Sequence, residues 1–503
     1  MRAFLMYADR DFDLRAPEPP NAEDLVADLG LTTLFDAMSL GDELLAEVAR
    51  CAVLNGLTNP EDIRYRQHIL EDCLSHPGTV RRIYELAGAA IAGERKIYHN
   101  FRRSPEVVLR RSVDVLELLL PHLAELRRIA DTDGPQYRSA GLTTFFRMLA
   151  GELDDAFFQA VHHHARALKF RHGLLVSARF GAGVQGVGYV LRRPNEDGDN
   201  FLRRFLRRER SALTYRIPER DEAGARALGE LRDRGLNQVA NALAQAIEHM
   251  LSFFRRLRTE LGFYLGCLNL HERLTGKGEP TCVPEPLTGD MPVLDCRGLY
   301  DLALSLSMQE RTVGNDVTAD GVALVVVTGA NRGGKSTFLR SVGQAQLMMQ
   351  CGMSVSATMF RTTVSSGLFT HYRREEDTTM SSGKLDEELA RMSTIVDDIG
   401  PTDVLLCNES FASTNEREGS EIARQIVRAL LDVGVRVLFV THMYDLAEGW
   451  YRDERDVALF LRAERDADAR RSFRLTDGEP LPTSYGEDLY HRIFEPARAA
   501  PSP

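Results

Sequence analysis

The chain has 503 residues, of which 44% are hydrophobic and 27% are charged, and its formal net charge is −11. These proportions are typical of a soluble globular protein, and the length allows about two to four domains around a large core. The negative charge argues against indiscriminate nucleic-acid binding but is compatible with a local basic surface. The seven cysteines are scattered and include no C-x-x-C pair. This pattern favours reduced thiols in a cytoplasmic protein over a disulfide framework or a zinc site.

The first 30 residues predict an N-terminal arm that leads into the fold. They are mixed in character and include a turn-rich segment at Ala16–Asn21. For a signal peptide, the acidic residues come too early and the apolar run is too short. No apolar run in the chain approaches the roughly 20 residues of a membrane-spanning helix, so we expect no membrane partner.

Residues 31–289 predict a mostly helical domain that contains a strand-forming segment at about residues 173–217. In this segment, short β-branched and aromatic runs alternate with glycine-rich turns. Residues 161–220 hold 13 Lys and Arg against 5 Asp and Glu, a balance of +8 in a chain of net charge −11. Five arginines are bunched there: Arg203, Arg204, Arg207, Arg208 and Arg210. They fit either a solvated helix face or a surface that contacts the phosphate groups of nucleic acid.

A single long helix is predicted from about Glu222 to Leu274. Apolar residues recur there at steps of three and four, which gives a heptad-like apolar seam. A helix of about 50 residues would extend for roughly 75 Å at 1.5 Å per residue, so it suits a strut or lever. The turn-rich segment Gly276–Gly289 then predicts a boundary, and residues 290–503 form the second domain.

The strongest motif begins at a buried strand and continues into a helix. The apolar run Val322–Val327 is followed by Gly329, four residues, Gly334, Lys335 and Ser336, which is the phosphate-loop pattern G-x-x-x-x-G-K-S. The glycines let backbone N–H groups turn towards phosphate oxygens, and the helix adds the positive end of its dipole. Lys335 is predicted to reach the β- and γ-phosphates, and the Ser336 hydroxyl to ligate Mg²⁺. The predicted ATP-binding residues of this loop are Gly329, Ala330, Asn331, Arg332, Gly333, Gly334, Lys335, Ser336 and Thr337.

Two later strands end in polar residues that suit ATP hydrolysis. Val404–Cys407 is followed by Asn408 and Glu409, where phosphate-loop ATPases of this layout carry two acidic residues beside Mg²⁺. The amide of Asn408 keeps the oxygen but loses the charge, so we expect weaker Mg²⁺ binding and slow hydrolysis. Glu409 is the candidate general base. A third strand, Arg436–Val440, leads to His442, which could hydrogen-bond the γ-phosphate or the water beside it.

With these motifs, the chain resembles the MutS superfamily, the ATP-binding-cassette-type (ABC-type) ATPases of DNA mismatch repair and their relatives. The family pattern T-G-x-N-x-G-G-K-S-T is similar to Thr328–Thr337, and D-E-x-x-x-x-T-x-x-x-x-G is similar to Asn408–Gly419. The family's T-H pair and C-terminal S-Y-G segment look like Thr441–His442 and Ser484–Gly486. The resemblance covers most of residues 30–490 and is strongest in the last third.

The resemblance also implies contacts that the residues alone do not indicate. Asn315 and Asp316 lie where the family places the loop on the adenine side of ATP. Met380–Met392 lies where the family has its signature loop, which offers hydrogen-bond donors to the γ-phosphate bound by the partner subunit. Ser382 and Gly383 match that loop, whereas later positions depart from it.

The sequence therefore predicts a multidomain protein, with a mostly α-helical core and lever domain followed by an α/β P-loop ATPase domain of ABC type. The resemblance implies a homodimer whose ATPase domains close around ATP and Mg²⁺. We expect an ATP-switched binder of DNA structure without sequence preference. Mismatch recognition is not expected, because the family's N-terminal mismatch-reading and connector domains have no counterpart here. The alternative is an ATP-switched scaffold for protein partners that does not act on nucleic acid, to which the net negative charge lends weight.

Overall fold

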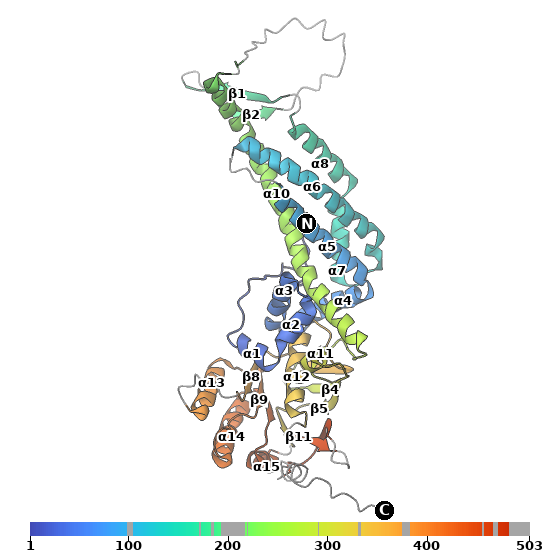
Figure 1. The fold of residues 1–503 in the computed structure, drawn as a ribbon, viewed down its shortest axis with the longest axis vertical. Coiled ribbons are helices and arrows are strands. Elements are labelled where there is room, and N and C mark those ends of the chain that lie inside the picture. Colours follow the sequence, from blue (N-terminus) through green and yellow to red (C-terminus); the bar gives the residue numbers. More distant parts are fainter. Residues whose placement is uncertain are drawn as a thin grey trace, which may run out of the picture. The chain divides into compact units, whose positions relative to one another are not determined.

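The computed structural model of the chain describes residues 1–97, 104–170, 173–182, 186–192, 217–218, 220–289, 291–329, 333–374, 383–454, 457–465 and 471–481 (Figure 1). They form two compact units, each built from several segments of the chain. The first unit comprises Met1–Ala3, Arg81–Tyr137 and Leu142–Arg258. The second comprises Phe4–Val80, Arg138–Gly141 and Thr259–Pro503. The domain limits 1–30, 31–289 and 290–503 stay predictions.

The first unit is mostly helical. Its helices are drawn mainly from α5 (Pro77–Lys96), α6 (Pro105–Thr132), α7 (Ala140–Glu152), α8 (Asp155–Leu168) and the N-terminal part of α10 (Glu222–Gly276). An antiparallel hairpin of β1 (Leu175–Phe180) and β2 (Gly186–Arg192) follows α8, which confirms strands within the predicted strand-forming segment. The predicted arginine cluster, at residues 203–210, lies outside the described residues.

The helix α10 confirms the long helix predicted from the sequence. It runs without a break from Glu222 to Gly276, although residues up to Arg258 belong to the first unit and later ones to the second. Most of the predicted apolar seam is buried, as expected for residues that recur at steps of three and four. Its buried members are Leu236, Ile247, Phe254, Leu257 and Leu261, whereas Val239, Leu243 and Met250 are half-buried.

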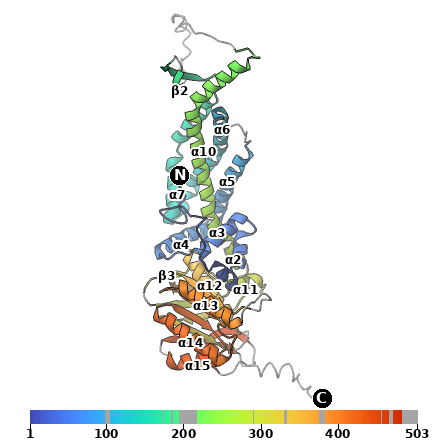
Figure 2. The same ribbon diagram turned by 90° about the vertical axis from the view of Figure 1, so that its left-hand side faces the viewer.

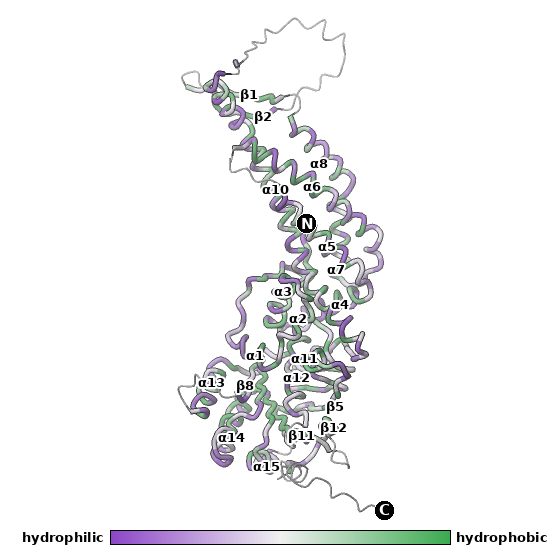
Figure 3. Tube along the Cα trace, viewed as in Figure 1, coloured by the Kyte–Doolittle hydropathy of each residue, from purple (hydrophilic) through white to green (hydrophobic). Residues whose placement is uncertain are grey.

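The core of the second unit is a six-stranded sheet with the order β12-β11-β6-β10-β9-β8. The five strands from β11 to β8 are parallel, and β12 pairs antiparallel with β11 at one edge. The central strands are apolar and buried, as parallel strands covered on both faces must be (Figure 3). The strands are β6 (Leu324–Thr328), β8 (Leu368–Tyr372), β9 (Val404–Asn408), β10 (Arg436–Val440), β11 (Ala458–Arg465) and β12 (Arg471–Asp477).

Helices cover both faces of this sheet. On one face, Val326, Cys407 and Phe439 pack in one apolar cluster with side chains of α13, α14 and α15 (Figure 2). Alternate strand residues face the other way, where Leu406 lies against Gly343 of α12. The helices are α12 (Lys335–Gln350), α13 (Lys384–Asp398), α14 (Glu416–Asp432) and α15 (Tyr444–Asp453).

Two smaller groups of elements complete the second unit. One is a four-stranded sheet, in the order β3-β7-β4-β5, together with the helix α11 (Leu302–Ser307). The other is a set of N-terminal helices. The four strands are β3 (Glu285–Leu287), β4 (Leu294–Leu299), β5 (Asn315–Thr318) and β7 (Met359–Thr363). The N-terminal helices are α1 (Ala22–Asp28), α2 (Leu31–Ser39), α3 (Glu43–Leu54) and α4 (Pro60–Ser75).

Hydrogen bonds to backbone carbonyl groups join the N-terminal segment of the chain to α12. The Gln344 side chain donates to the carbonyl oxygen of Leu29 at 2.8 Å. At the end of α12, the N–H of Leu57 donates to the carbonyl oxygen of Gln350 at 2.7 Å. These bonds satisfy polar groups that burial would otherwise leave unpaired, and they fix the helix that begins at the phosphate loop.

All seven cysteines are unpaired. Burial raises the pKa of the Cys267 thiol well above its ordinary value, which keeps this sulfur protonated and unreactive. Within the described parts of the chain, no helix has both the length and the apolar character that a membrane crossing requires.

Gly343→Ala should destabilise the second unit. A Cβ atom at this position would lie 2.7 Å from side-chain carbons of both Leu29 and Leu406. Overpacking of this kind costs typically about 1–3 kcal/mol of unfolding free energy. Thermal unfolding measured by circular dichroism tests the effect, and Gly78→Ala is the helical control because a Cβ there meets nothing within 4 Å. Equal stability of the two variants would contradict the close packing of α12.

Candidate functional site

The phosphate-loop motif connects the carboxyl end of β6 to the start of α12. Gly329 and Gly334 adopt φ angles of 111° and 91°, a region that strongly favours glycine. A Cβ atom on Gly329 would also lie only 3.0 Å from the backbone nitrogen of Ala463. The N–H groups of the first turn of α12, which have no carbonyl partner within the helix, lie beside this loop. Three predicted loop residues lie outside the described part of the chain: Ala330, Asn331 and Arg332.

Lys335 is the first residue of α12, and its side chain turns back into the loop. Its Nζ donates a hydrogen bond to the carbonyl oxygen of Gly329 at 2.8 Å, and the residue is 5% exposed. Burial lowers the pKa of Lys335, although the negative charge of Glu409 acts in the opposite direction. Gly333 is buried beside it, and Thr337 is half-buried in the first turn of the helix. The ammonium group therefore lies where a phosphate group on the loop would meet it.

Ser336 and Asn408 join the phosphate loop to the end of β9. The Ser336 Oγ donates a hydrogen bond to Asn408 Oδ1 at 2.7 Å. The site therefore places a hydroxyl oxygen and an amide oxygen together at the N-terminus of α12. Mg²⁺ takes oxygen ligands and commonly binds to one or two protein groups plus phosphate and water. The residues present fit a Mg²⁺ ion that arrives with a nucleotide.

Glu409 and His442 form a close pair at the ends of β9 and β10. The Glu409 carboxylate is hydrogen-bonded to Nδ1 of His442, and the same Oε2 accepts from the backbone N–H of His442 at 3.1 Å. The hydrogen bond to Glu409 raises the pKa of His442, while burial and the charges of Lys335 and Arg373 oppose the shift. The structure thus brings Glu409, His442 and Lys335, which are distant in sequence, to one edge of the sheet.

The predicted adenine-side residues, Asn315 and Asp316, use their side chains within the fold. Asn315 accepts a hydrogen bond from the N–H of Leu475 at 2.8 Å and donates to the carbonyl oxygen of Phe473 at 3.4 Å. Asp316 accepts from the N–H of Gly298 at 2.6 Å. Asn315 therefore fixes the strand β12, which lies beside the phosphate loop.

Phe473 is a site residue that the sequence did not indicate. Its aromatic side chain is 44% exposed, and its φ of 57° is unusual for a residue other than glycine. A Cβ atom on Gly334 would lie 3.3 Å from the Phe473 carbonyl oxygen, so this strand borders the phosphate loop. No motif marks Phe473, because its position depends on the pairing of β12 with β11 rather than on local sequence.

Other predicted residues lie at the edge of the described part of the chain or outside it. Gly383 directly precedes α13 and has an extended backbone conformation. Ser382, the other residue matched to the signature loop, lies outside the described residues, as does the segment Ser484–Gly486. The suggested contact with a partner subunit therefore stays a prediction.

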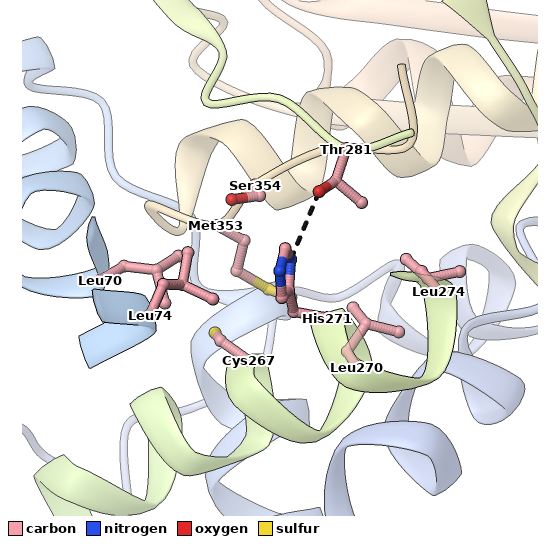
Figure 4. A pocket seen from close by; sticks show the side chains of 9 residues that line it. All are labelled: Leu70, Leu74, Cys267, Leu270, His271, Leu274, Thr281, Met353 and Ser354. Carbon is pink, nitrogen blue, oxygen red and sulfur yellow. Dashed lines mark hydrogen bonds between the residues drawn. The ribbon is translucent and has the colours of Figure 1, made fainter. Parts of the chain in front are cut away.

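Cavities among the described residues of each unit lie away from these residues. In the second unit, His271 and Thr281 line a cavity of about 10 Å³, and Figure 4 shows their side chains facing each other, with Nδ1 and Oγ1 3.4 Å apart. This volume is at the lower limit for a single water molecule, so it cannot take a nucleotide. In the first unit, a cavity of about 490 Å³ lies between α6, α8, β2 and α10. Its lining is mostly apolar, which does not suit phosphate groups.

The fold and the motif define the second unit as a phosphate-loop α/β protein. Two family models match the chain: the MutS2 N-terminal domain over residues 58–277 and MutS domain V over residues 325–496. The domain V match contains Lys335, Asn408 and His442. The chain belongs to the MutS superfamily.

Curated relatives match parts of the chain at modest identity. MutS protein homolog 4 from Mus musculus is 25% identical over 150 residues, 30% of this chain and 16% of its own length. The DNA mismatch repair protein MutS from Chloroflexus aurantiacus is 30% identical over 145 residues, 28% of this chain and 15% of its own length. The protein of the same name from Protochlamydia amoebophila is 22% identical over 333 residues, 63% of this chain and 38% of its own length. The matched regions thus span less than two fifths of these relatives.

His442 should titrate above its ordinary pKa of 6.5 because it is bonded to Glu409. A raised folded-state pKa means that the pair stabilises the fold fully below the ordinary value, and that this stabilisation is lost as the pH rises through the raised value. NMR titration of the His442 ring measures the shift, which Glu409→Gln should largely abolish. Glu416→Gln is the control, because its carboxylate bonds the N–H of Asp445 instead. An unchanged titration in Glu409→Gln would contradict the pair.

Proposed function

We propose that this chain is a dimeric ATPase in which ATP switches the binding of DNA structures. One observation carries the proposal: a phosphate loop, an oxygen pair and a carboxylate–histidine pair converge at the carboxyl ends of β6, β9 and β10. Ligands of open α/β sheets bind outside these strand ends. Membership of the MutS superfamily, and relatives named as DNA mismatch repair proteins, support the same function.

The phosphates of ATP would bind to the phosphate loop, and the adenine base would lie beside this loop. The loop N–H groups and Lys335 would take the phosphate oxygens through charge-assisted hydrogen bonds. Ser336 and Asn408 would hold Mg²⁺, which when bound adds positive charge beside those oxygens. Phe473 offers an exposed aromatic face next to Gly334 that suits stacking of the adenine.

Glu409 is the proposed general base for ATP hydrolysis. Its carboxylate accepts a proton from the attacking water, whose oxygen bonds to the terminal phosphorus as the bond to the β-phosphate oxygen breaks. His442 holds Oε2 of this carboxylate through both its backbone N–H and its ring. When the ring is protonated, which the raised pKa of His442 favours, its Nε2 also carries a hydrogen and would donate it to the γ-phosphate. Hydrolysis should be slow, because Asn408 provides no negative charge to hold the metal ion.

The proposed enzyme is an ABC-type ATPase that closes as a homodimer. In this arrangement Ser382 and Gly383 of one protomer would approach the γ-phosphate on its partner. The position of Gly383 immediately before α13 supports the proposal, because a segment at a helix N-terminus offers N–H groups to an anion. Residues 290–503 would form the ATPase domain, and residues 31–289 the core and lever domain that carries closure to a distant surface.

We further propose that this distant surface binds DNA without sequence preference, in the cytoplasm. The balance of +8 over residues 161–220 supports a phosphate-contacting surface, since such contacts position a protein without reading sequence. The net charge of −11 favours the alternative, an ATP-switched scaffold for protein partners. ATPase rates with and without duplex, branched and single-stranded DNA separate the two functions, because only the DNA binder should respond.

Lys335→Ala and Glu409→Gln should separate ATP binding from hydrolysis. Lys335→Ala removes the charged contact to phosphate, so it should abolish tight nucleotide binding. Glu409→Gln should still bind ATP but turn it over about 10²–10⁴-fold more slowly, the usual contribution of a general base. Equilibrium binding of a fluorescent ATP analogue and phosphate release measure the two effects. ATP affinity equal to the parent's in Lys335→Ala, or turnover within a few-fold in Glu409→Gln, would refute these roles.

Substitution of four clustered arginines by serine should weaken DNA binding and reduce its dependence on salt. The variant carries Ser at residues 203, 204, 207 and 208, which are Arg in the parent. Each lost phosphate contact should flatten the slope of log K against log salt by about 0.9. Basal ATPase activity should survive, since the substitutions are not among the residues predicted to bind or hydrolyse ATP. Equal salt slopes with equal melting temperatures would exclude this cluster as the DNA surface.

A further inference from the structure

The segment that carries Glu409 has an unusual backbone. Glu409 and Phe411 adopt φ angles of 57° and 62°, although neither residue is glycine. Left-handed conformations are unfavourable for such residues and persist only when the surrounding structure imposes them. Ser410, between the two, is completely buried. The contacts of Ser410 and Phe411 therefore help to hold the turn from which the Glu409 carboxylate projects towards His442.

His371, on the neighbouring strand β8, provides these contacts. Its Nδ1 lies 2.7 Å from the Ser410 Oγ, and the Ser410 hydroxyl is also 2.8 Å from the His371 carbonyl oxygen. The ring of Phe411 stacks on the imidazole, with ring centroids 5.4 Å apart and planes inclined by 24°. Both His371 and Ser410 are fully buried, so no water competes for these bonds.

A contact on the opposite side of the imidazole ring indicates which ring nitrogen carries the hydrogen. Nε2 lies 3.0 Å from the carbonyl oxygen of Glu388 in α13, and a carbonyl oxygen can only accept, so Nε2 carries a hydrogen. Burial, helped by the charge of Arg391, lowers the pKa of His371 to about 4, so the ring is neutral at ordinary pH. Nδ1 is then an acceptor, as the His371 carbonyl oxygen is, so the single hydrogen of the Ser410 hydroxyl is shared between these two acceptors of His371. Ser410 is thus the donor, and His371 the acceptor, in both contacts.

We propose that His371 and Ser410 are positioning residues that orient the Glu409 carboxylate for hydrolysis. The hydrogen bond from Ser410 to His371 holds the strained turn in the conformation that brings Glu409 to His442. The side-chain bonds described for both residues run to each other and to Glu388, so both would act through Glu409 rather than on the nucleotide. The inference rests on the proposed ATPase function and specifies how its catalytic carboxylate is held.

Two substitutions at His371 can each keep one of its side-chain hydrogen bonds and remove the other. In His371→Asn the side-chain amide oxygen can occupy the place of Nδ1 and accept from Ser410, whereas the contact to Glu388 is lost. In His371→Gln the amide nitrogen can reach the place of Nε2 and donate to the Glu388 carbonyl, whereas the contact to Ser410 is lost. Ser410→Ala removes the hydroxyl alone. The control is Ser356→Ala, another fully buried serine, whose hydroxyl donates to the Tyr300 carbonyl oxygen at 2.9 Å.

Steady-state ATPase kinetics and thermal melting of the full chain test the proposal, with Glu409→Gln measured alongside. Ser410→Ala and His371→Gln should lower kcat by at least about tenfold, because a small misplacement of a catalytic group is costly. Their KM for ATP should stay within about twofold of the parent value, since the groups that bind phosphate are intact. His371→Asn and Ser356→Ala should retain kcat within about threefold of the parent value.

Three outcomes would overturn the inference. Unchanged kcat in Ser410→Ala and His371→Gln would mean that the hydrogen bond does not orient Glu409. An equal loss of kcat in His371→Asn and His371→Gln, in step with melting temperature, would mean that His371 serves only core packing. Equal turnover by the parent and Glu409→Gln would instead refute the proposed ATPase function, and the positioning role with it.

Discussion

The parallel register of β6, β10 and β9 is the constraint on which the candidate site depends. Val440 lies opposite Val327 on one side and Asn408 on the other, so the three strands end at the same level. Backbone bonds extend the alignment by one residue, from Thr441 to Val327 at 3.1 Å and from Glu409 to Val440 at 2.9 Å. Motifs separated by many tens of residues thereby meet within hydrogen-bonding distance. Without this register, the Ser336–Asn408 and Glu409–His442 contacts could not form.

The helix α12 connects the candidate site to the N-terminal part of the chain. Gly343 allows Leu29 and Leu406 to approach α12 closely, so an N-terminal residue and a central strand share one contact point. At the other end of α12, the buried Arg66 donates to the carbonyl oxygens of Met6, at 2.8 Å, and Cys351, at 3.3 Å. The phosphate loop therefore begins a helix that is fixed at its middle and at its end. A ligand that shifted the loop would act on the N-terminal helices through these contacts.

The sequence predicted those parts of the site that short motifs encode. The strand before Gly329, the helix that follows the phosphate loop and the ends of β9 and β10 follow from local patterns of apolar and polar residues. The long helix α10 was likewise predictable, because its seam repeats at steps of three and four. Phe473 and the His371–Ser410 pair were not, since strand pairing and packing place them and no local pattern marks such positions. The same holds for the close approach of Leu29 to α12, which residues 1–30 did not suggest.

Asn408 gives the proposed nucleotide site one carboxylate at the end of β9 instead of two. Glu409 is the acidic residue next to Asn408, and its Oε2 is already bonded to His442. In the proposed mechanism, an aspartate at residue 408 would add a negative charge near the phosphates, which a bound metal ion would have to offset. The amide keeps the hydrogen bond with Ser336 and avoids that repulsion, so binding of ATP should depend less on Mg²⁺ than hydrolysis does. In the proposed mechanism, Asn408 would therefore favour a long-lived ATP-bound state over hydrolysis.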